Sequence, residues 1–500
     1  MSHSHGQMTL GNLGRVPSPD YVRREPEKSV LYQTVANHLN TFLATVEMEG
    51  KRLPFHVTEE FEAFLRCGVL AYGFLRLRCE GCKHERLVAF SCKKRGVCSS
   101  CGGRRMAETA ANLVDHVFPK VGVRQWVLSF PFQVRFLLAR DSKLQSACLE
   151  IVLRAITSFL KKKAKKQGAR GKLQTGAITL IQRFGGSINL NPHFHMLVLD
   201  GAYAVTEAGK IPQFHWIDHL SDEEVAALVK TIAIRIVRYL KRQGHFRDDS
   251  EYLAQNSVPE DEIFPELQAA SVQSKIALGE RKGQYVRRLG RLELLIGGKA
   301  ETTAPLCAEI QGFSLHAGVH CAPYEREKLE KLARYVARPA VAEDRLRVTS
   351  KGEITYRLKK PYTDGTTHLI FSPLEFMEKL AALVPRPRGH LVRYHGCLGP
   401  HAKIRSLIVP EKPKTAANTT APQPVGQAKP RSRIKWIELL ARVFAIDMKV
   451  CPNCGGDFKP IAAILETKVI VRILDHLGLP SRPPPIAPAR YSAAFDHCQA

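Results

Sequence analysis

The sequence predicts an α+β protein, and three observations support this fold class. Apolar residues recur at helical spacing within residues 29–74. Residues 177–184 and 193–199 are apolar runs of strand length, and glycines punctuate both. The alternation of strands and helices that an eight-unit barrel requires is missing from the sequence.

The expected elements follow in order from the N-terminus. Residues 1–28 are polar, contain prolines and are expected to form a loose arm, and helices follow over 29–74. A strand is expected over 125–130, because the run is apolar and stops before a proline. A long helix is expected over 144–166, and the two apolar runs described above follow it as strands.

Capping signals predict two helices in the second half of the chain. Ser221-Asp-Glu-Glu224 matches a capping box and begins a helix that extends to about residue 242. Ser372-Pro-Leu-Glu375 begins another, with a cap and a proline at the first helical position. Residues 324–337 have a charged helical pattern. Three short runs indicate a small antiparallel sheet: 345–348, 354–358 and 367–371.

The composition limits the classes of function. The 500 residues include 74 Lys and Arg against 47 Asp and Glu, and the net charge of +27 favours a polyanionic partner, most simply nucleic acid. The 44% share of hydrophobic residues excludes wholesale disorder. No apolar run reaches about 18 residues, so no membrane span is expected. The N-terminus lacks the features of a signal peptide, so we expect a reducing, cytoplasmic compartment for the 13 cysteines.

Two CxxC pairs in the N-terminal part predict a structural zinc site. Cys79-Glu-Gly-Cys82 and Cys98-Ser-Ser-Cys101 are separated by fifteen residues, a spacing that is typical of zinc sites. Each pair can form a tight turn that presents two thiolates, and two such turns complete a tetrahedron around Zn²⁺. Two alternate ligands lie nearby: Cys92 and His84. A group of buried free thiols is the alternative interpretation.

A third pair, Cys451-Pro-Asn-Cys454, is typical of half a zinc ribbon. A closed second zinc site needs two more ligands, and the downstream candidates are His476, His497 and Cys498. The alternative is a degenerate turn that binds no metal.

A histidine pair opens the second predicted strand. Because side chains alternate along a strand, His193 and His195 are expected on one face and Phe194 on the other. Two imidazoles at this spacing can chelate one cation, which could polarise a phosphoryl or carbonyl oxygen or generate hydroxide. The alternative is two histidines that are satisfied by other contacts or by solvent.

Two tracts of the chain are strongly basic. Residues 151–172 contain eight Lys and Arg and no acid, and they include Lys161, Lys162 and Lys163. Residues 385–435 contain eleven Lys and Arg and one acidic residue. We expect these tracts to neutralise the backbone of single-stranded DNA with a salt-dependent affinity, although charge runs can also be solvated faces.

These motifs together resemble a known family. The sequence resembles the insertion-sequence-ninety-one and common-region (ISCR) transposases of the HUH superfamily of single-strand DNA endonucleases, over roughly residues 30–410. The resemblance depends on the following segments in this order: the cluster Cys79–Cys101, Gln182-x-Phe184-Gly, Asn191-Pro-His193-Phe-His195, Arg334-Tyr335-Val-Ala-Arg338-Pro339, Tyr394-His-Gly396 and Pro400. It implies a mainly antiparallel sheet that carries the histidines, and a helix that presents the tyrosine.

The resemblance also implies a chemistry. His193 and His195 would hold Mg²⁺ or Mn²⁺ against the scissile phosphate, and Gln182 is a candidate third ligand. Tyr335 matches the nucleophile of the family and would become linked to the 5′ end of the DNA, leaving a free 3′-hydroxyl. The implied partners are single-stranded DNA at the element termini and the target site. The sequence has no phosphate-binding loop, so no nucleotide cofactor is expected.

The surroundings of Tyr335 refine this expectation. Arg334 and Arg338 flank it, supply the positive charge that an ionising phenol needs, and are expected to contact DNA. The positions one helical turn before and after it hold a lysine and a proline, so the chain resembles the single-tyrosine branch of the superfamily. A second strand transfer would then use Tyr324, a water or a second protomer, and a homo-oligomer is a candidate assembly.

The expected domains and location follow from these assignments. Five segments are expected: a flexible arm (1–28), a helical and zinc-binding domain (29–118), an HUH catalytic core (119–409), a flexible linker rich in proline (410–433) and a small C-terminal unit with helix and CxxC pair (434–500). The implied location is the bacterial cytoplasm, at the nucleoid.

Three other functions stay open at this point. A rolling-circle replication initiator would share the chemistry but normally lacks this zinc module. A non-catalytic zinc-containing DNA-binding regulator would need no nucleophile. A transposase with an acidic triad would leave His193 and His195 unexplained.

Overall fold

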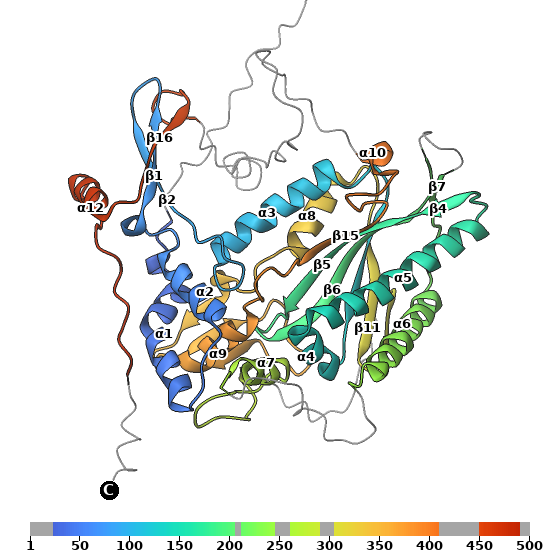
Figure 1. Ribbon diagram of the computed structural model, residues 1–500, viewed down its shortest axis with the longest axis horizontal. Coiled ribbons are helices and arrows are strands. Elements are labelled where there is room, and N and C mark those ends of the chain that lie inside the picture. Colours follow the sequence, from blue (N-terminus) through green and yellow to red (C-terminus); the bar gives the residue numbers. More distant parts are fainter. Residues whose placement is uncertain (1–23, 206–211, 246–260, 291–304, 410–449, 491–500) are drawn as a thin grey trace, which may run out of the picture.

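The structure is a computed structural model, which describes residues 24–205, 212–245, 261–290, 305–409 and 450–490 (Figure 1). The predicted linker and nearly all of the predicted N-terminal arm lie outside the described residues. Within the described ranges, no helix combines the length and the apolar character that crossing a membrane requires.

The centre of the molecule is a six-stranded antiparallel sheet in the order β10-β11-β3-β6-β5-β15. Its strands are β3 (Val123–Ser129), β5 (Gly176–Phe184), β6 (Leu190–Leu199), β10 (Cys307–Ile310), β11 (Phe313–Cys321) and β15 (Val392–Gly396). The three central strands are the ones that the apolar runs predict, and the α+β class is confirmed. The sheet therefore places the histidine-bearing strand β6 in its interior, between β3 and β5.

Helices cover both faces of this sheet (Figure 1). One face packs on α4 (Phe132–Arg140), α5 (Ser142–Lys166) and α6 (Asp222–Arg242), and the other on α3 (Ser99–His116) and α8 (Arg326–Val336). Side chains of β6 alternate between the two layers as predicted. Phe194 packs edge-on against Phe130 in the first layer, with ring centroids 5.0 Å apart, whereas Leu197 and Leu199 contact the second layer.

Local sequence signals fix the ends of two helices. Ser221 caps α6 and Ser372 caps α9 (Pro373–Leu383), and both form the complete reciprocal capping box with a glutamate three residues on. Pro373 occupies the first position of α9, where its missing N–H has no intrahelical partner to lose. Both predictions are confirmed.

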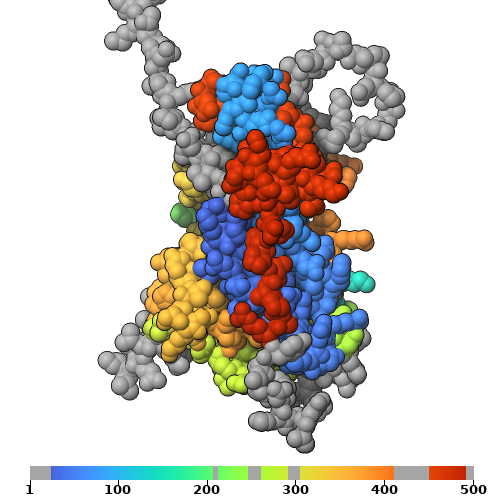
Figure 2. Space-filling view, turned by 90° about the vertical axis from the view of Figure 1, so that its left-hand side faces the viewer, coloured from blue at the N-terminus to red at the C-terminus, as the bar shows by residue number. Residues whose placement is uncertain are grey.

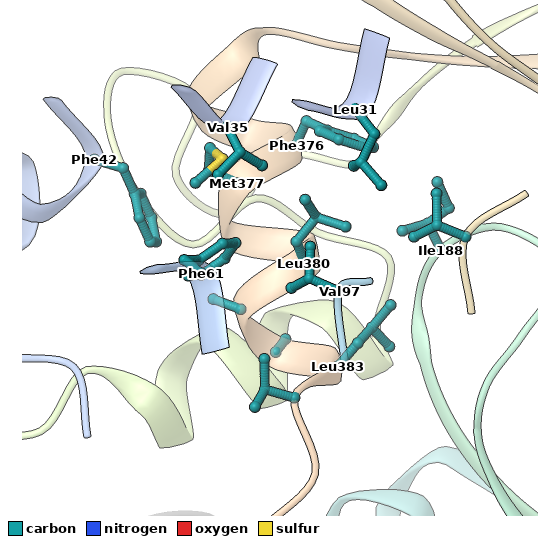
Figure 3. Close-up of a cluster of buried hydrophobic side chains, with 14 of the residues drawn as sticks. Leu31, Val35, Phe42, Phe61, Val97, Ile188, Phe376, Met377, Leu380 and Leu383 are labelled. Atoms are coloured by element: carbon teal, nitrogen blue, oxygen red, sulfur yellow. The ribbon is translucent and has the colours of Figure 1, made fainter. Parts of the chain in front are cut away.

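A second core joins segments that lie far apart in the sequence. It combines α1 (Val30–Met48) and α2 (Phe55–Arg66) with α7 (Phe264–Val272) and α9. Figure 3 shows Phe376, Met377 and Leu380 of α9 among side chains of the N-terminal helices. A four-stranded antiparallel sheet borders this core: β9 (Arg287–Leu289), β12 (Leu346–Val348), β13 (Ile354–Arg357) and β14 (His368–Phe371). The sequence predicts three of these strands but neither β9 nor α7.

Two small sheets complete the described fold. The first contains β4 (Lys172–Gln174), β7 (Gly201–Val205) and β8 (Gln213–Trp216). The second contains β1 (Phe74–Cys79), β2 (Glu85–Ala89) and β16 (Phe458–Ile464), and it is followed by α12 (Thr467–His476), which the sequence predicts. The remaining short helices are η1 (Pro26–Lys28), η2 (Leu70–Tyr72), η3 (Glu343–Arg345) and α10 (Arg405–Ile408). The sheet β16-β1-β2 therefore joins the two ends of the described chain.

Candidate active site and cysteine clusters

The imidazoles of His193 and His195 converge on the α8 side of the central sheet. Both side chains are buried, and their Nε2 atoms lie 3.0 Å apart. Gln182 stands opposite His193 in the register of β5 and β6, so its side chain lies on the same face. Gln125 on β3 places its Nε2 2.9 Å from Nδ1 of His195. Three neighbouring strands thus contribute polar side chains to one buried site.

Hydrogen bonds and burial determine the protonation of the pair. Nδ1 of His193 donates to the carbonyl oxygen of Asn191 at 2.7 Å, which leaves the lone pair of its Nε2 facing His195. Burial is the main cause that lowers the pKa of His193 to about 4 and that of His195 to about 3. Both imidazoles are therefore neutral at neutral pH, the form that can bind a metal.

The donor set fits a divalent cation. Two ligands at about 2.1 Å from one ion and at right angles to each other lie about 3.0 Å apart, which matches the Nε2–Nε2 distance. Among the described residues, no carboxylate, thiol or third histidine joins the pair. The amide nitrogen of Gln182 donates to the carbonyl oxygen of Val336 at 3.2 Å, which leaves its own carbonyl oxygen as a further ligand atom.

Tyr335 lies beside the histidines, on the last turn of α8. Its ring is perpendicular to that of His195, with centroids 6.4 Å apart, and its side chain is 42% exposed. The guanidinium of Arg338 lies 5.0 Å and the ammonium of Lys359 4.6 Å from the centre of the Tyr335 ring. Arg334 is half-buried on the same helix, and none of the described ring contacts of Tyr335 involves it. The structure therefore brings together the residues that the resemblance picks out, and it adds Lys359.

A cavity of about 120 Å³ adjoins this site, between α3, β5 and the segment that follows α8. Its lining combines apolar residues and glycines with the polar residues Thr109 and Gln182 and with four arginines: Arg95, Arg105, Arg183 and Arg338. Within the described part of the chain, Nε and Nη2 of Arg183 and Nε of Arg338 are buried without a hydrogen-bond partner. We call this cavity the arginine pocket; its charge suits an anionic ligand.

The basic tract of α5 divides into residues with different surroundings. Lys161 lines a second cavity, of about 400 Å³, together with Arg154, Arg393 and His395 and with one acidic residue, Glu150, which forms an ion pair with Arg154. Lys162 is exposed. Lys163 instead donates to both carboxylate oxygens of Glu224, at 2.5 and 2.7 Å, and to the carbonyl oxygen of His219.

One group of four cysteines lies at the start of α3. It consists of Cys67, Cys92, Cys98 and Cys101, whose Sγ atoms lie within 4.8 Å of one another. The Sγ distances from Cys67 to Cys101 and from Cys98 to Cys67 are both 3.6 Å. Thiolates bound at about 2.3 Å to a tetrahedral zinc ion are about 3.8 Å apart. Hydrogen bonds from the other three lower the pKa of the Cys101 thiol, whereas hydrogen bonds to Cys101 raise the pKa values of the Cys92 and Cys98 thiols.

The second group corrects the predicted ligand set. Cys79 and Cys82 do not join Cys98 and Cys101; they lie with Cys451 and Cys454 in a separate group. The physical reason is strand pairing: β16 pairs with β1 and delivers the C-terminal cysteines to the β1–β2 turn.

The alternate zinc ligands that the sequence offers have different positions in the structure. Cys92 belongs to the first group, while the ring of His84 packs edge-on against Phe458, with centroids 6.0 Å apart, and joins neither group. His476 at the end of α12 joins neither group, and His497 and Cys498 lie outside the described residues.

Comparison with known families gives two matches. A family model described as "Putative transposase" matches residues 176–405, and a model described as "Transposase zinc-binding domain" matches residues 34–130. The chain is a transposase of the insertion-sequence-ninety-one family. Neither the curated proteins nor the solved structures include a match.

The two matched regions divide the sites of the transposase. The zinc-binding domain contains the whole first cysteine group, which supports structural zinc there. The second matched region contains Gln182, His193, His195 and Tyr335. Membership of the family makes the chain a DNA-cleaving enzyme with DNA as its partner.

Sequence reasoning missed three residues around these sites. Gln125 and Lys359 reach the site from β3 and from the loop after β13, and neither belongs to a motif. Cys67 follows α2 and is not part of a CxxC pair, so the CxxC spacing does not indicate it as a ligand. Cys92 also lies outside any CxxC pair, 25 positions after Cys67, and the presence of two such cysteines in this part of the chain is the signal that could have found it.

Proposed function

We propose that this transposase cleaves single-stranded DNA and transfers the strand through a 5′-phosphotyrosine on Tyr335. The observation that carries the proposal is the position of Tyr335, partly exposed and beside two buried, neutral imidazoles. A phenol that attacks a phosphodiester needs a strand within reach and a way to stabilise charge on the phosphate. Both requirements meet at the end of α8.

The histidine pair is the proposed holder of the catalytic divalent ion, Mg²⁺ or Mn²⁺. His193 binds through Nε2, and the carbonyl oxygen of Gln182 is the third protein ligand. His195 also binds through Nε2 once the side-chain amide of Gln125 turns over, so that its oxygen accepts from Nδ1–H in place of the amide nitrogen that donates there in the structure. When bound, the ion supplies Lewis-acid polarisation of the scissile phosphate. Nδ1 of His193 stays hydrogen-bonded to the carbonyl oxygen of Asn191, which fixes the direction of its ring.

The residues of the chain then perform the following step. The phenolic oxygen of Tyr335 attacks phosphorus, a phosphorus–oxygen bond to tyrosine forms, and the bond from phosphorus to the 3′-oxygen breaks. The phenol loses its proton and the departing 3′-oxygen gains one, so the exchange needs no nucleotide hydrolysis. The positive charges of Arg338 and Lys359 over the ring stabilise the negative charge that develops on the phenolic oxygen.

Two basic cavities are the proposed path of the strand. The arginine pocket adjoins Gln182 and shares Arg338 with the tyrosine site, so it is suited to a phosphate next to the scissile one. The cavity beside Lys161 lies on the other side of β15 and is suited to phosphates further along the strand. Lys162 and Arg334 remain proposed contacts to the backbone. We leave Lys163 out of the proposed contacts, because its ammonium already binds Glu224.

The direct test is covalent capture of the strand. Purified protein is incubated with Mn²⁺ and single-stranded DNA from the flanks of the coding sequence that is labelled at its 3′ end, then denatured and separated by electrophoresis. We expect a labelled band at the mass of the protein plus the part of the strand on the 3′ side of the cut. Tyr335→Phe removes this band, whereas the matched control Tyr285→Phe, which changes another exposed tyrosine, retains it. An adduct that survives Tyr335→Phe would show that another residue is the nucleophile.

A second variant addresses the second strand transfer. Tyr324 is 85% exposed, just before α8. If it acts as a second nucleophile, Tyr324→Phe keeps the first adduct and stops joining of the cut strand. If a second protomer supplies the nucleophile, the Tyr335→Phe variant is mixed with the active protein to form mixed dimers. Joining of the cut strand then falls in proportion to the fraction of mixed dimers.

A further inference from the structure

We propose that Cys79, Cys82, Cys451 and Cys454 bind a second zinc ion, which fastens the C-terminal unit to the zinc-binding domain. Here the C-terminal unit means residues 450–490. The site is independent of the proposed DNA chemistry. It also differs from the zinc centre of the matched domain, because half of its ligands lie far beyond residue 130.

The four sulfur atoms have the arrangement of a tetrahedral thiolate site. Sγ of Cys79 lies 3.4 Å from Sγ of Cys454, and Sγ of Cys82 lies 3.5 Å from Sγ of Cys451. These distances are close to the spacing of about 3.8 Å expected for four thiolates around zinc, and far longer than a disulfide bond of about 2.05 Å. The four residues contribute one sulfur atom each, all within 4.8 Å of one another.

The two turns that carry the cysteines fit each other. A Cβ atom on Gly81 would lie 3.2 Å from Sγ of Cys454, and a Cβ atom on Gly456 would lie 3.2 Å from Sγ of Cys79. Each glycine therefore leaves room for a sulfur atom of the opposite turn. The backbone N–H of Glu80 also donates to the carbonyl oxygen of Asp457 at 3.0 Å, which holds the turns in register.

Strand pairing next to the site supports its geometry without a metal. β1 and β16 pair from Phe74 opposite Ile464 to Cys79 opposite Phe458. Cys79 and Cys451 are buried in a small apolar cluster with Leu77, whereas Cys82 and Cys454 are exposed. The sulfur atoms thus converge at the end of an ordered sheet, where water and ions have access from one side.

The C-terminal unit contacts several N-terminal elements, and Figure 2 shows it as a red band across the blue N-terminal surface. Ile470 and Leu474 of α12 pack against Leu70 and Phe74. Further on, the backbone N–H of Ala487 donates to a carbonyl oxygen of α1 at 3.0 Å. The contacts of α12 and of the residues after it are small, since α12 is largely exposed, and the pairing of β16 with β1 is the more extensive contact. A metal bond at the end of this pairing would add a further link between the unit and the zinc-binding domain.

Zinc is the ion that the donor set favours. Four thiolates in a tetrahedron bind zinc or iron, and a ribbon of two paired turns is typical of structural zinc. A split site of this kind makes metal binding dependent on docking of the C-terminal unit. Docking in turn depends on the metal.

The first test counts metal ions in the full-length protein. Elemental analysis by mass spectrometry is expected to find about two zinc ions per chain in the unaltered protein. Cys82→Ser and Cys454→Ser each lower this by one ion, and the double variant lowers it by one rather than two, because both residues serve the same ion. The matched control Cys307→Ser, a half-buried cysteine outside both groups, keeps two ions.

Several results would overturn the proposal. One zinc ion in the unaltered protein, iron in place of zinc, or a disulfide between Cys79 and Cys454 in freshly purified protein would each exclude it. Loss of an ion in Cys454→Ser but not in Cys82→Ser would show that the C-terminal turn forms a site of its own. Circular dichroism checks that each variant has the helix content of the unaltered protein.

The second test measures attachment of the C-terminal unit. A specific protease site is inserted between residues 420 and 421, and the cut protein is passed over a sizing column. The fragment is expected to elute with the rest of the chain, and to separate from it in Cys82→Ser although that change lies outside the fragment. Equal retention of the fragment in both proteins would mean that the metal does not fasten the unit. The DNA adduct on Tyr335 is assayed separately, so failure of this proposal leaves the proposed function standing.

Discussion

Nε2 of Gln125 lies 2.9 Å from Nδ1 of His195, so a residue on β3 holds the ring of a residue on β6. Gln125 is 3% exposed, and its partner is one of the two histidines at the centre of the site. Partners of this kind fix the ring orientation of a metal ligand and tune its affinity. Gln125 is therefore a positioning residue of the proposed ion site.

Gln125→Met is expected to weaken binding of the proposed ion. The side chain keeps its length and loses its polar atoms, so His195 is no longer held. The Mn²⁺ concentration that gives half-maximal adduct should rise by roughly 10- to 100-fold, with the plateau at saturating Mn²⁺ less affected. Titration of Mn²⁺ in the adduct assay measures this. An unchanged Mn²⁺ requirement would mean that Gln125 has a packing role only.

The charges over the ring of Tyr335 are expected to affect the rate of adduct formation. Lys359→Met and Arg338→Met each remove one positive charge that lies over the ring of Tyr335. Each should slow adduct formation by about tenfold or more at saturating DNA. Arg334→Met, which removes a positive charge from α8 itself, is the control and should mainly weaken DNA binding, most strongly at low salt, and make the affinity less dependent on salt. Equal rates in all three variants would argue against a role for the ring contacts.

The first cysteine group is expected to control the stability of the second core. Cys98 and Cys101 are buried within this core, and Cys98 also caps α3 by accepting from the N–H of Cys101. Cys98→Ser should remove one zinc ion and lower the unfolding temperature, because structural zinc contributes several kcal/mol to a small domain. Calorimetry with and without a chelator measures the change. A chelator that leaves the melting curve of the unaltered protein intact would contradict the expectation.

The buried pair Glu378 and Lys379 offers a test of packing far from the site. Both side chains are 2% exposed, the carboxylate accepts from the N–H of Ala277, and the ammonium binds it at 2.6 Å. Glu378→Ala leaves the buried ammonium without its carboxylate, with the carbonyl oxygen of Lys275 as its remaining partner, and it leaves the N–H of Ala277 without an acceptor. The free energy of unfolding should fall by about 3–5 kcal/mol, measured by urea denaturation. Exchange of the exposed Glu280 for Ala is the control and should change it by less than about 0.5 kcal/mol.

Acid is expected to destabilise the protein through His395. Burial, followed by the charge of Arg393, lowers the pKa of His395 to about 4, and its Nε2 is buried without a described partner. The unfolded chain takes up this proton near pH 6.5, whereas the folded chain resists it until about pH 4. Stability should therefore fall as the pH drops from 6.5 towards 4. His395→Gln should make the fall of the urea midpoint between pH 7 and pH 5 smaller, and an unchanged fall would rule out this residue as a cause.

Local patterns correctly predicted the features that depend on neighbours in the sequence. Alternation along one strand places His193 and His195 on the same face and Phe194 on the other. The reciprocal caps at Ser221 and Ser372 form as expected, because they need only residues three positions apart. The resemblance added Tyr335, whose distance from the histidines no local pattern could give.

The partners of these residues depend on contacts across the fold. Gln125 and Lys359 carry no motif, and they reach the site because β3 pairs with β6 and the loop after β13 passes near α8. The cysteine pairs show the same limit. Spacing predicts which residues form metal-binding turns, but Cys79 and Cys82 meet Cys451 and Cys454 only because β16 pairs with β1.

The sequence by itself therefore determined the types of site in this transposase: a histidine pair, a tyrosine and several cysteine turns. Tertiary structure alone decided which of them lie together and which cysteines form one group. The reason is physical: periodicity and spacing act over a few residues, whereas the pairing of strands hundreds of residues apart follows from burial of apolar surface over the whole chain.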